Sequence, residues 1–170
     1  MDNKVTFKGN PLTLSGKVVE KGNPAPGFKA LKQDLSETGL ADFMGKVKIL
    51  TSFPSLDTPV CDLQVKEFNK RAVNFSPDVA VIGISMDLPF AQKRFCQEND
   101  INHVTVVSDH RDASFGLNYG LLIKELRLLA RSIIIVDKEE IVRYIQVVRE
   151  VTSPPDYEAA LKALQDILKG

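Results

Sequence analysis

The sequence has 170 residues, a length typical of one domain that buries its own core. Hydrophobic residues make up 44% and charged residues 26%, which are ordinary globular values and argue against a disordered or fibrous chain. The 22 lysines and arginines balance the 22 aspartates and glutamates, so no overall charge attracts nucleic acid or an anionic membrane. We therefore predict a single domain over residues 1–170 with neither of these partners.

The N-terminal segment carries no apolar run long enough for a signal peptide, and no part of the chain has the run of apolar residues that a membrane span needs. We therefore expect a cytoplasmic protein.

Residues 5–8 and 12–14 alternate apolar and polar side chains around Gly-Asn-Pro at 9–11, which predicts a β-hairpin within about residues 1–20. Residues 22–28 are rich in proline and glycine and should form an extended loop.

The stretch at residues 47–61 predicts a strand, a turn and the start of a helix. Residues 47–50 are short, apolar and partly β-branched, and a loop with Pro54 follows them. Thr58 then has the character of an N-cap and Pro59 that of the first helical residue, where its missing N–H costs nothing. Cys61 is therefore expected in the first turn of the helix.

Two interpretations of Cys61 follow from that position. Free backbone N–H groups and the positive end of the helix dipole favour a thiolate, the nucleophilic form of cysteine, and a nearby cation would complete such a site. Alternatively, Cys61 is a packed core residue, because it belongs to an apolar stripe with helical spacing. The stripe consists of Cys61, Val65, Phe68, Ala72 and Phe75.

Further along the chain, strands and helices alternate. Residues 78–85 predict a buried strand, a helix begins at 87–89 and continues to about Glu98, and another strand follows at 104–107. This order implies parallel pairing with right-handed crossovers.

The last third of the chain predicts a short helical turn over 115–120, followed by a loop that includes Lys124, Glu125 and Arg127. Residues 131–137 predict the clearest strand, and 141–148 should return antiparallel beside it. Residues 156–168 predict a final helix, with an apolar stripe of Tyr157, Leu161, Leu164 and either Ile167 or Leu168.

The chain has only two cysteines, Cys61 and Cys96, and a structural disulfide would be unusual in a reducing cytosol. If they pair, the bond is expected to be transient. Together with His103 and His110 they match no usual zinc spacing. Residues 61–64 also lack the second cysteine of a C-x-x-C dithiol motif.

The string P-S-L-D-T-P-V-C-D at 54–62 resembles the active-site signature of the peroxiredoxins, P-x-x-x-T-x-x-C, and in particular that of the thiol peroxidase branch. The resemblance covers essentially the whole chain and includes F-C at Cys96, L-L-A-R-S ending at Ser132 and P-D-Y-E-A-A-L at 155–161. It implies a thioredoxin-like α/β fold, in which helices flank a central mixed sheet and a hairpin is added at the N-terminus.

The resemblance also implies roles for single residues. Cys61 would attack the peroxide, and Cys96 would resolve the resulting sulfenic acid by forming an intramolecular disulfide. Thr58 would offer its hydroxyl to the peroxide or the thiolate, and Arg131 would supply the cation. Pro54 would shape the loop and shield the pocket. Taken singly, Thr58 could be a plain N-cap, Arg131 an ordinary charge at a strand start and Cys96 a buried helical cysteine.

The implied activity is the reduction of hydrogen peroxide and organic hydroperoxides, with recycling by thioredoxin or a similar dithiol protein. The family usually forms homodimers, and no metal or organic cofactor is expected. A disulfide requires Cα atoms within about 7 Å, so at least one helix end that carries a cysteine should unwind during turnover. The alternative function is a non-enzymatic peroxide sensor, in which the disulfide changes the shape of the protein.

Overall fold

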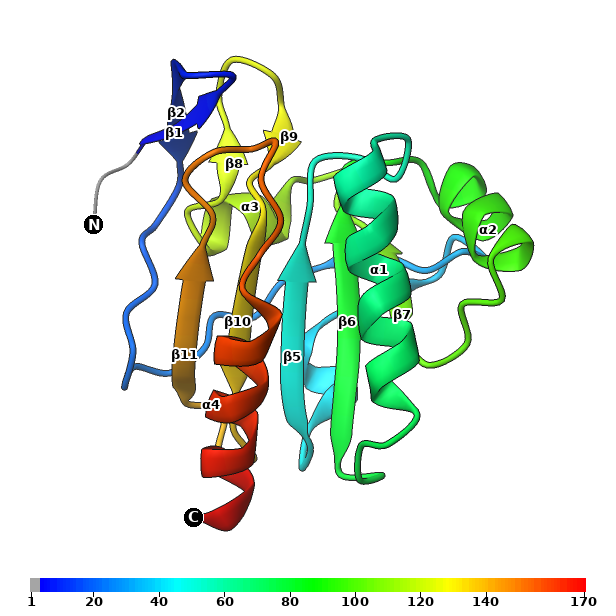
Figure 1. The fold of residues 1–170 in the computed structure, drawn as a ribbon, viewed down its shortest axis with the longest axis vertical. Helices are drawn as coiled ribbons and strands as arrows, with labels where there is room; N and C mark the ends of the chain where they lie inside the picture. The colour runs from blue at the N-terminus through cyan, green and yellow to red at the C-terminus, as the bar shows by residue number, and fades with distance from the viewer. Residues whose placement is uncertain (1–3) are drawn as a thin grey trace.

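A seven-stranded mixed sheet forms the centre of the computed structural model, which describes residues 4–170 (Figure 1). Its strand order is β11-β10-β5-β6-β7-β3-β4. The parallel core β5-β6-β7 agrees with the predicted crossovers, and the other neighbouring strands pair antiparallel. The strands are β3 (Ala30–Leu31), β4 (Glu37–Thr38), β5 (Val47–Ser52), β6 (Val79–Ser85), β7 (Thr105–Ser108), β10 (Ser132–Val136) and β11 (Val142–Val147).

Helices cover this sheet at different places. In Figure 1, α1 and α4 lie in front of the sheet, while α2 stands at its edge beside β7. Ring contact between Phe68 and Tyr157 joins α1 to α4, with ring centroids 5.7 Å apart. The helices are α1 (Pro59–Ala72), α2 (Pro89–Glu98), α3 (Ser114–Asn118) and α4 (Tyr157–Lys169), with a 3-10 turn at Leu40–Phe43.

The core is divided by the sheet, because successive strand residues point to opposite faces. On β10, Ile133 and Ile135 join the cluster beneath α1 and α4, whereas Ile134 and Val136 join the cluster on the other face. All four side chains are almost completely buried. By the same alternation, Arg131 comes to lie on the face that carries α1.

The predicted N-terminal hairpin is present in the described residues, with β1 at Lys4–Phe7 and β2 at Asn10–Ser15. Its turn is tighter than the expected Gly-Asn-Pro, because Asn10 already pairs with Phe7. The turn residues are Lys8 and Gly9, with φ of 50° and 83°. Two positive φ values are typical of the two-residue turn whose twist matches a hairpin.

The expected loop at residues 124–127 is instead the turn of a second hairpin, between β8 (Leu122–Ile123) and β9 (Leu128–Leu129). It joins the first hairpin in a small sheet of order β1-β2-β8-β9. Both strands have only two residues, too few for an alternating pattern to show in the sequence.

The other predicted helices and strands agree with the structure to within about two residues at each end. In α4 the stripe is completed by Ile167, which packs on the core, while Leu168 is exposed. Within residues 4–170, no helix is long and apolar enough to cross a membrane.

Candidate active site

Cys61 is the third residue of α1 and lies on the side of the helix that faces the sheet. Thr58 is the N-cap residue and Pro59 begins the helix, as predicted. The Cys61 side chain is completely buried, and Val65 and Phe68 continue the same stripe into the core. Cys61 therefore satisfies both interpretations of its position. It is packed in the core, as the apolar stripe predicts, and it lies at the helix N-terminus, which favours a thiolate.

Arg131 meets Cys61 from the sheet side. Its Nη1 donates a hydrogen bond to Cys61 Sγ at 3.3 Å, and only 2% of Arg131 is exposed. The two residues are 70 positions apart in the sequence. The end of β5 and the start of β10 are antiparallel neighbours, which brings the helix after β5 over the residue before β10.

Gln64 holds the guanidinium in place. Gln64 Oε1 accepts a hydrogen bond from Arg131 Nη1 at 2.8 Å. Its Nε2 donates to Thr51 Oγ1 at 2.6 Å and to the Ser52 carbonyl at 3.1 Å. Because Gln64 is completely buried and its donor and acceptor are both engaged, the amide links the arginine firmly to β5.

The other arm of the guanidinium binds a loop carbonyl. Arg131 Nη2 donates to the Val151 oxygen at 2.7 Å, while Nε is buried and has no partner among the described residues. Within residues 4–170 the Arg131 guanidinium therefore donates to a thiol sulfur, an amide oxygen and a backbone carbonyl, none of them a carboxylate.

The two remaining residues of the signature line the loop before α1. Pro54 is buried, whereas Thr58 is exposed. The Thr58 hydroxyl makes no cap to the helix and donates to the Ser55 carbonyl at 3.0 Å. Thr58 is thus the N-cap by backbone position only, and its hydroxyl bonds neither the helix nor the sulfur in this structure.

An aspartate on the neighbouring strand end fixes the same loop. Asp87 accepts hydrogen bonds from Ser55 Oγ at 2.8 Å and from the Leu56 N–H at 2.9 Å. Ser85 Oγ donates to the same carboxylate at 2.6 Å. Since β5 and β6 are parallel, their ends lie together, and Asp87 ties the two following loops to each other.

Cys96 lies late in α2 and is buried, with 7% of its surface exposed. Burial raises the pKa of its thiol, and a hydrogen bond with Gln33 partly offsets this effect. Cys96 and Cys61 belong to the same core cluster, yet both are free thiols. A cavity of about 540 Å³ lies between the first turn of α1 and α2, and its lining includes Thr58, Arg94 and Phe95.

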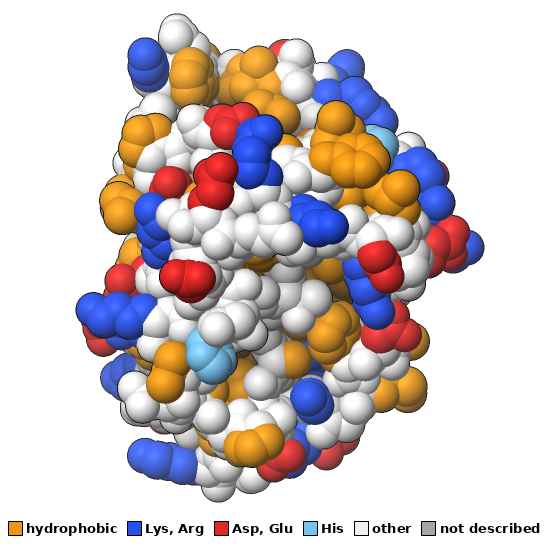
Figure 2. All heavy atoms as spheres, turned by 90° about the vertical axis from the view of Figure 1, so that its right-hand side faces the viewer, with side chains coloured by type: hydrophobic (Ala, Val, Ile, Leu, Met, Phe, Trp, Pro, Cys, Tyr) orange, Lys and Arg blue, Asp and Glu red, His pale blue; other side chains and the backbone are white. Residues whose placement is uncertain are grey.

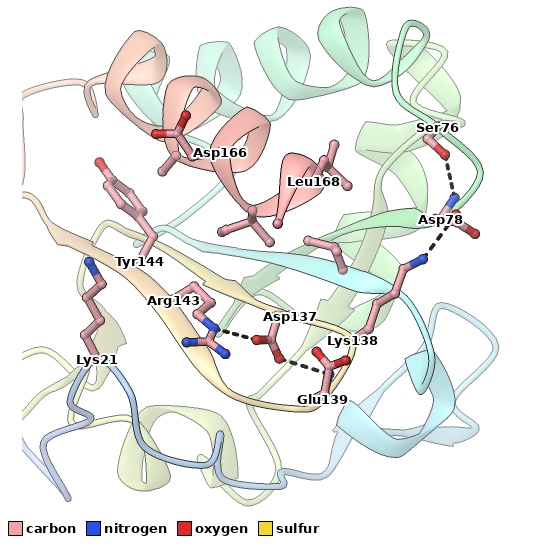
Figure 3. Close-up of a pocket in the computed structure, with 14 residues that line it drawn as sticks. Lys21, Ser76, Asp78, Asp137, Lys138, Glu139, Arg143, Tyr144, Asp166 and Leu168 are labelled. Atoms are coloured by element: carbon pink, nitrogen blue, oxygen red, sulfur yellow. Dashed lines mark hydrogen bonds and ion pairs between the residues drawn. The ribbon is translucent and has the colours of Figure 1, made fainter.

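A larger hollow, of about 980 Å³, lies at the opposite end of the sheet (Figure 3). Two ion pairs line it: Arg143 binds Asp137, and Lys138 binds Asp78 at 3.3 Å. It contains no cysteine. The buried thiols and the buried arginine therefore locate the chemistry at the end where α1 begins.

The surface beside α2 has no dominant charge. Figure 2 shows acidic, basic and hydrophobic side chains interspersed over that face of the molecule. His103 and His110 do not come together with the cysteines, and within residues 4–170 no three metal-binding side chains of the His, Cys, Asp and Glu types lie close enough to hold a metal.

Comparison with known proteins identifies the family. A family model described as Redoxin matches residues 20–161. The thiol peroxidase of Bacillus subtilis (strain 168) is 48% identical over 166 residues, which cover 98% of this chain and 99% of that protein. The chain belongs to the redoxin family. The thiol peroxidase of Oceanobacillus iheyensis, 48% identical over 94% of this chain and 97% of its own length, agrees with this assignment.

Solved structures agree with the fold. A peroxiredoxin-like protein from Aquifex aeolicus superposes with a TM-score of 0.92 at 39% identity, over 98% of both chains. Thiol peroxidase from Chromobacterium violaceum, at 22% identity and a TM-score of 0.87, has the same fold. These matches confirm the resemblance to the thiol peroxidase branch, the thioredoxin-like fold and a thiol-dependent peroxidase activity.

Three members of this redoxin site were missed from the sequence. Gln64 had a usable signal, because a polar residue three positions after Cys61 lies on the same buried helix face. Asp87 has the weaker signal of a carboxylate directly after a strand. The Val151 carbonyl has none, because every residue carries the same backbone acceptor.

Proposed function

We propose that the protein reduces hydrogen peroxide and organic hydroperoxides with Cys61 as the nucleophile, and that Cys96 and a thioredoxin-like dithiol protein restore it. The observation that carries the proposal is the contact of 3.3 Å between Arg131 Nη1 and Cys61 Sγ in a completely buried position. Peroxide and thiol reductant are the general partners of the family, and the identities of both are part of this proposal.

The charge of Arg131 supports a thiolate at Cys61. A buried guanidinium is unfavourable unless it is paired with a negative charge or fully hydrogen-bonded. Its acceptors within residues 4–170 are neutral apart from Sγ, and Nε has no partner. Cys61 is thus the group beside it that can supply a negative charge by losing its proton. The helix N-terminus adds to the same preference.

In the first step, the Cys61 sulfur attacks one peroxide oxygen. An S–O bond forms as the O–O bond breaks, the departing oxygen takes up a proton and leaves as water or an alcohol, and Cys61 becomes a sulfenic acid. Arg131 would stabilise the negative charge that develops on the departing oxygen, and its free Nε–H is a spare donor. Thr58 would turn its hydroxyl from Ser55 towards the peroxide, and Pro54 would shield the loop.

In the second step, the Cys96 sulfur attacks the Cys61 sulfur, an S–S bond forms and water leaves. Cys61 opens α1 and Cys96 lies late in α2, so one or both helix ends must move before the sulfurs meet. The cavity of about 540 Å³ between these helices supports such a movement, because it gives side chains space to enter. A dithiol protein then reduces the disulfide and is itself oxidised.

The remaining features are also proposals. We infer a single domain over residues 1–170, a homodimer with catalysis complete within each chain, and a cytoplasmic location. They rest on the length of the chain and on the resemblance to the thiol peroxidase branch.

The test is the consumption of NADPH with thioredoxin, thioredoxin reductase and either hydrogen peroxide or cumene hydroperoxide. We expect many turnovers for the wild type and none for Cys61→Ser. Cys96→Ser should lose thioredoxin-coupled turnover and still form a sulfenic acid. A single stoichiometric oxidation without turnover would refute the peroxidase and favour a sensor, since both thiols are buried and their pairing would reshape two helices.

A further inference from the structure

The loop that carries the Val151 carbonyl is attached to the N-terminal hairpin. The Val151 N–H donates to the Thr6 carbonyl at 2.8 Å, and the Thr6 N–H donates to the Arg149 carbonyl at 2.7 Å. These two bonds form a parallel bridge between Thr6 and Glu150. Val151 is therefore bonded on its N–H side to β1 and on its carbonyl side to Arg131.

Glu150 is the centre of this attachment. Its Oε1 accepts hydrogen bonds from Thr6 Oγ1 at 3.0 Å and from the Gly9 N–H at 2.9 Å, both in the hairpin. Its Oε2 accepts from the Thr152 N–H at 2.8 Å and from Thr152 Oγ1 at 2.6 Å, within its own loop. The Glu150 carboxylate thus binds the hairpin with one oxygen and Thr152 with the other. Glu150 and Thr152 are the two neighbours of Val151 in the chain.

The position of the guanidinium depends on this loop, because the Val151 carbonyl holds its Nη2 arm. Gln64 and Cys61 both bind Nη1, the Val151 carbonyl alone binds Nη2 among the described residues, and Nε is unpaired. If the loop shifts, the guanidinium keeps only its Nη1 contacts and is free to turn about them. A group that stabilises charge in a buried site loses much of its effect when it is displaced.

We propose that Glu150 is a positioning residue that couples the N-terminal hairpin to the active site, by holding the Val151 carbonyl where it fixes Arg131 against Cys61. The inference deepens the proposed function and rests on it for its consequence in catalysis. The coupling itself concerns the reactivity of the Cys61 thiol, which can be measured without any peroxide.

The chemistry of the carboxylate suggests a sharp variant. Each oxygen of Glu150 accepts hydrogen bonds from two donors. Glu150→Gln keeps the size of the side chain, but its amide NH₂ is a donor and cannot accept from the pair of donors that it faces, so the hydrogen bonds of that pair are lost. Glu125→Gln is the matched control, because Glu125 also binds the hairpin, through the Thr13 N–H at 2.9 Å. Within residues 4–170, Glu125 makes no hydrogen bond to the loop at residues 148–153.

The experiment measures the rate at which iodoacetamide alkylates Cys61 at neutral pH, in full-length protein that carries Cys96→Ser. Iodoacetamide reacts with the thiolate, so the rate reports how well Arg131 stabilises it. We expect Glu150→Gln to slow alkylation about fivefold or more. Glu125→Gln should stay within about twofold of the parent. In an Arg131→Ala background, Glu150→Gln should have an effect of less than about twofold, because the group it positions is absent.

Two results would overturn the proposal: an unchanged alkylation rate in folded Glu150→Gln, or an equal slowing with and without Arg131. If Glu150→Gln shows no cooperative thermal transition, Thr6→Val replaces it, since that change removes one donor and keeps the β-branched shape. It should slow alkylation about twofold or more, and no change would again refute the coupling. Coupling in the alkylation assay without peroxide turnover would refute the proposed function and leave the positioning role intact.

Discussion

Arg131 and Cys61, 70 residues apart in the sequence, meet through a hydrogen bond of 3.3 Å inside the core of the protein. The pairing follows from two regular features of the fold. Strand alternation directs Arg131 towards the helices, and the apolar stripe of α1 directs Cys61 towards the sheet. A cation and a thiol are thereby brought together in a place from which water is excluded.

Replacement of Arg131 should slow the first oxidation of Cys61. Arg131→Ala removes the charge, and we expect the second-order rate constant with hydrogen peroxide to fall about 100-fold or more. Arg131→Lys keeps a charge, but it cannot bind Sγ and the Val151 carbonyl with a fixed fork, so an intermediate rate is expected. Stopped-flow measurement of sulfenic acid formation gives both values. Equal rates in Arg131→Ala and wild type would contradict the role of the guanidinium.

Gln64 should contribute to both stability and rate. Gln64→Leu removes one buried hydrogen-bond partner from Thr51 and one from Arg131, which should lower the free energy of unfolding by about 1–3 kcal/mol and also slow oxidation of Cys61. Urea unfolding and stopped-flow kinetics measure the two effects. Gln165→Leu, on the exposed side of α4, is the control and should change stability by about 0.5 kcal/mol or less. A loss of stability with no change in rate would confine Gln64 to a structural role.

The formation of the disulfide should loosen the helix ends that carry the cysteines. In the reduced protein, the Asp62 N–H bonds the Thr58 carbonyl and the Ile101 N–H bonds the Cys96 carbonyl. We expect amides at residues 58–64 and 90–98 to exchange with solvent faster after oxidation, as measured by hydrogen exchange with mass spectrometry. Identical exchange in the two forms would show that the sulfurs meet without unwinding.

Asp109 should make stability depend on pH. It is buried at the end of β7 and accepts hydrogen bonds from the N–H groups of Phe115 and Gly116, and burial raises the pKa of its carboxyl to about 6. Because this pKa lies above the ordinary 3.8, the folded protein binds the proton more tightly than the unfolded chain. Its contribution to stability is therefore lost as the pH rises from about 4 to about 6, by roughly 3 kcal/mol.

Thermal unfolding between pH 4 and pH 7 measures this effect. The Tm of the wild type minus that of Asp109→Asn should fall as the pH rises to about 6 and then level off. Asp34→Asn is the control, because hydrogen bonds from Ser36 lower the pKa of Asp34 and move its titration below this range. A difference that does not change with pH would refute the assignment to Asp109.

Much of the fold and part of the site could be predicted from the sequence because their signals are local. The helix start at Thr58-Pro59, the stripe from Cys61 to Phe68 and the apolar run of β10 each lie within a few residues. The string around Cys61 also resembles a known signature, and the L-L-A-R run at 128–131 resembles the segment of the same family that carries the arginine. Without that resemblance, Arg131 would be predicted as an ordinary charge at a strand start.

What the sequence could not predict depends on contacts between distant segments. Thr6 and Glu150 are 144 residues apart, and only the folded chain brings the hairpin beside the loop that binds Arg131. The pairing of β8 with β2 likewise involves two residues on each strand, which leave no periodic signal. The Thr58 hydroxyl is expected from the resemblance to bind the peroxide or the thiolate, or else to cap the helix, whereas in this structure it donates to the Ser55 carbonyl.

We propose that the Cys61 sulfur is the nucleophile that attacks peroxide and that Cys96 is its resolving partner. The most direct measurement treats reduced wild type and Cys96→Ser with one equivalent of hydrogen peroxide in the presence of dimedone, and maps the products by mass spectrometry. We predict a Cys61–Cys96 disulfide in the wild type and a dimedone adduct on Cys61 in Cys96→Ser. An adduct on Cys96 of the wild type, or no modification of Cys61 in either protein, would contradict the mechanism.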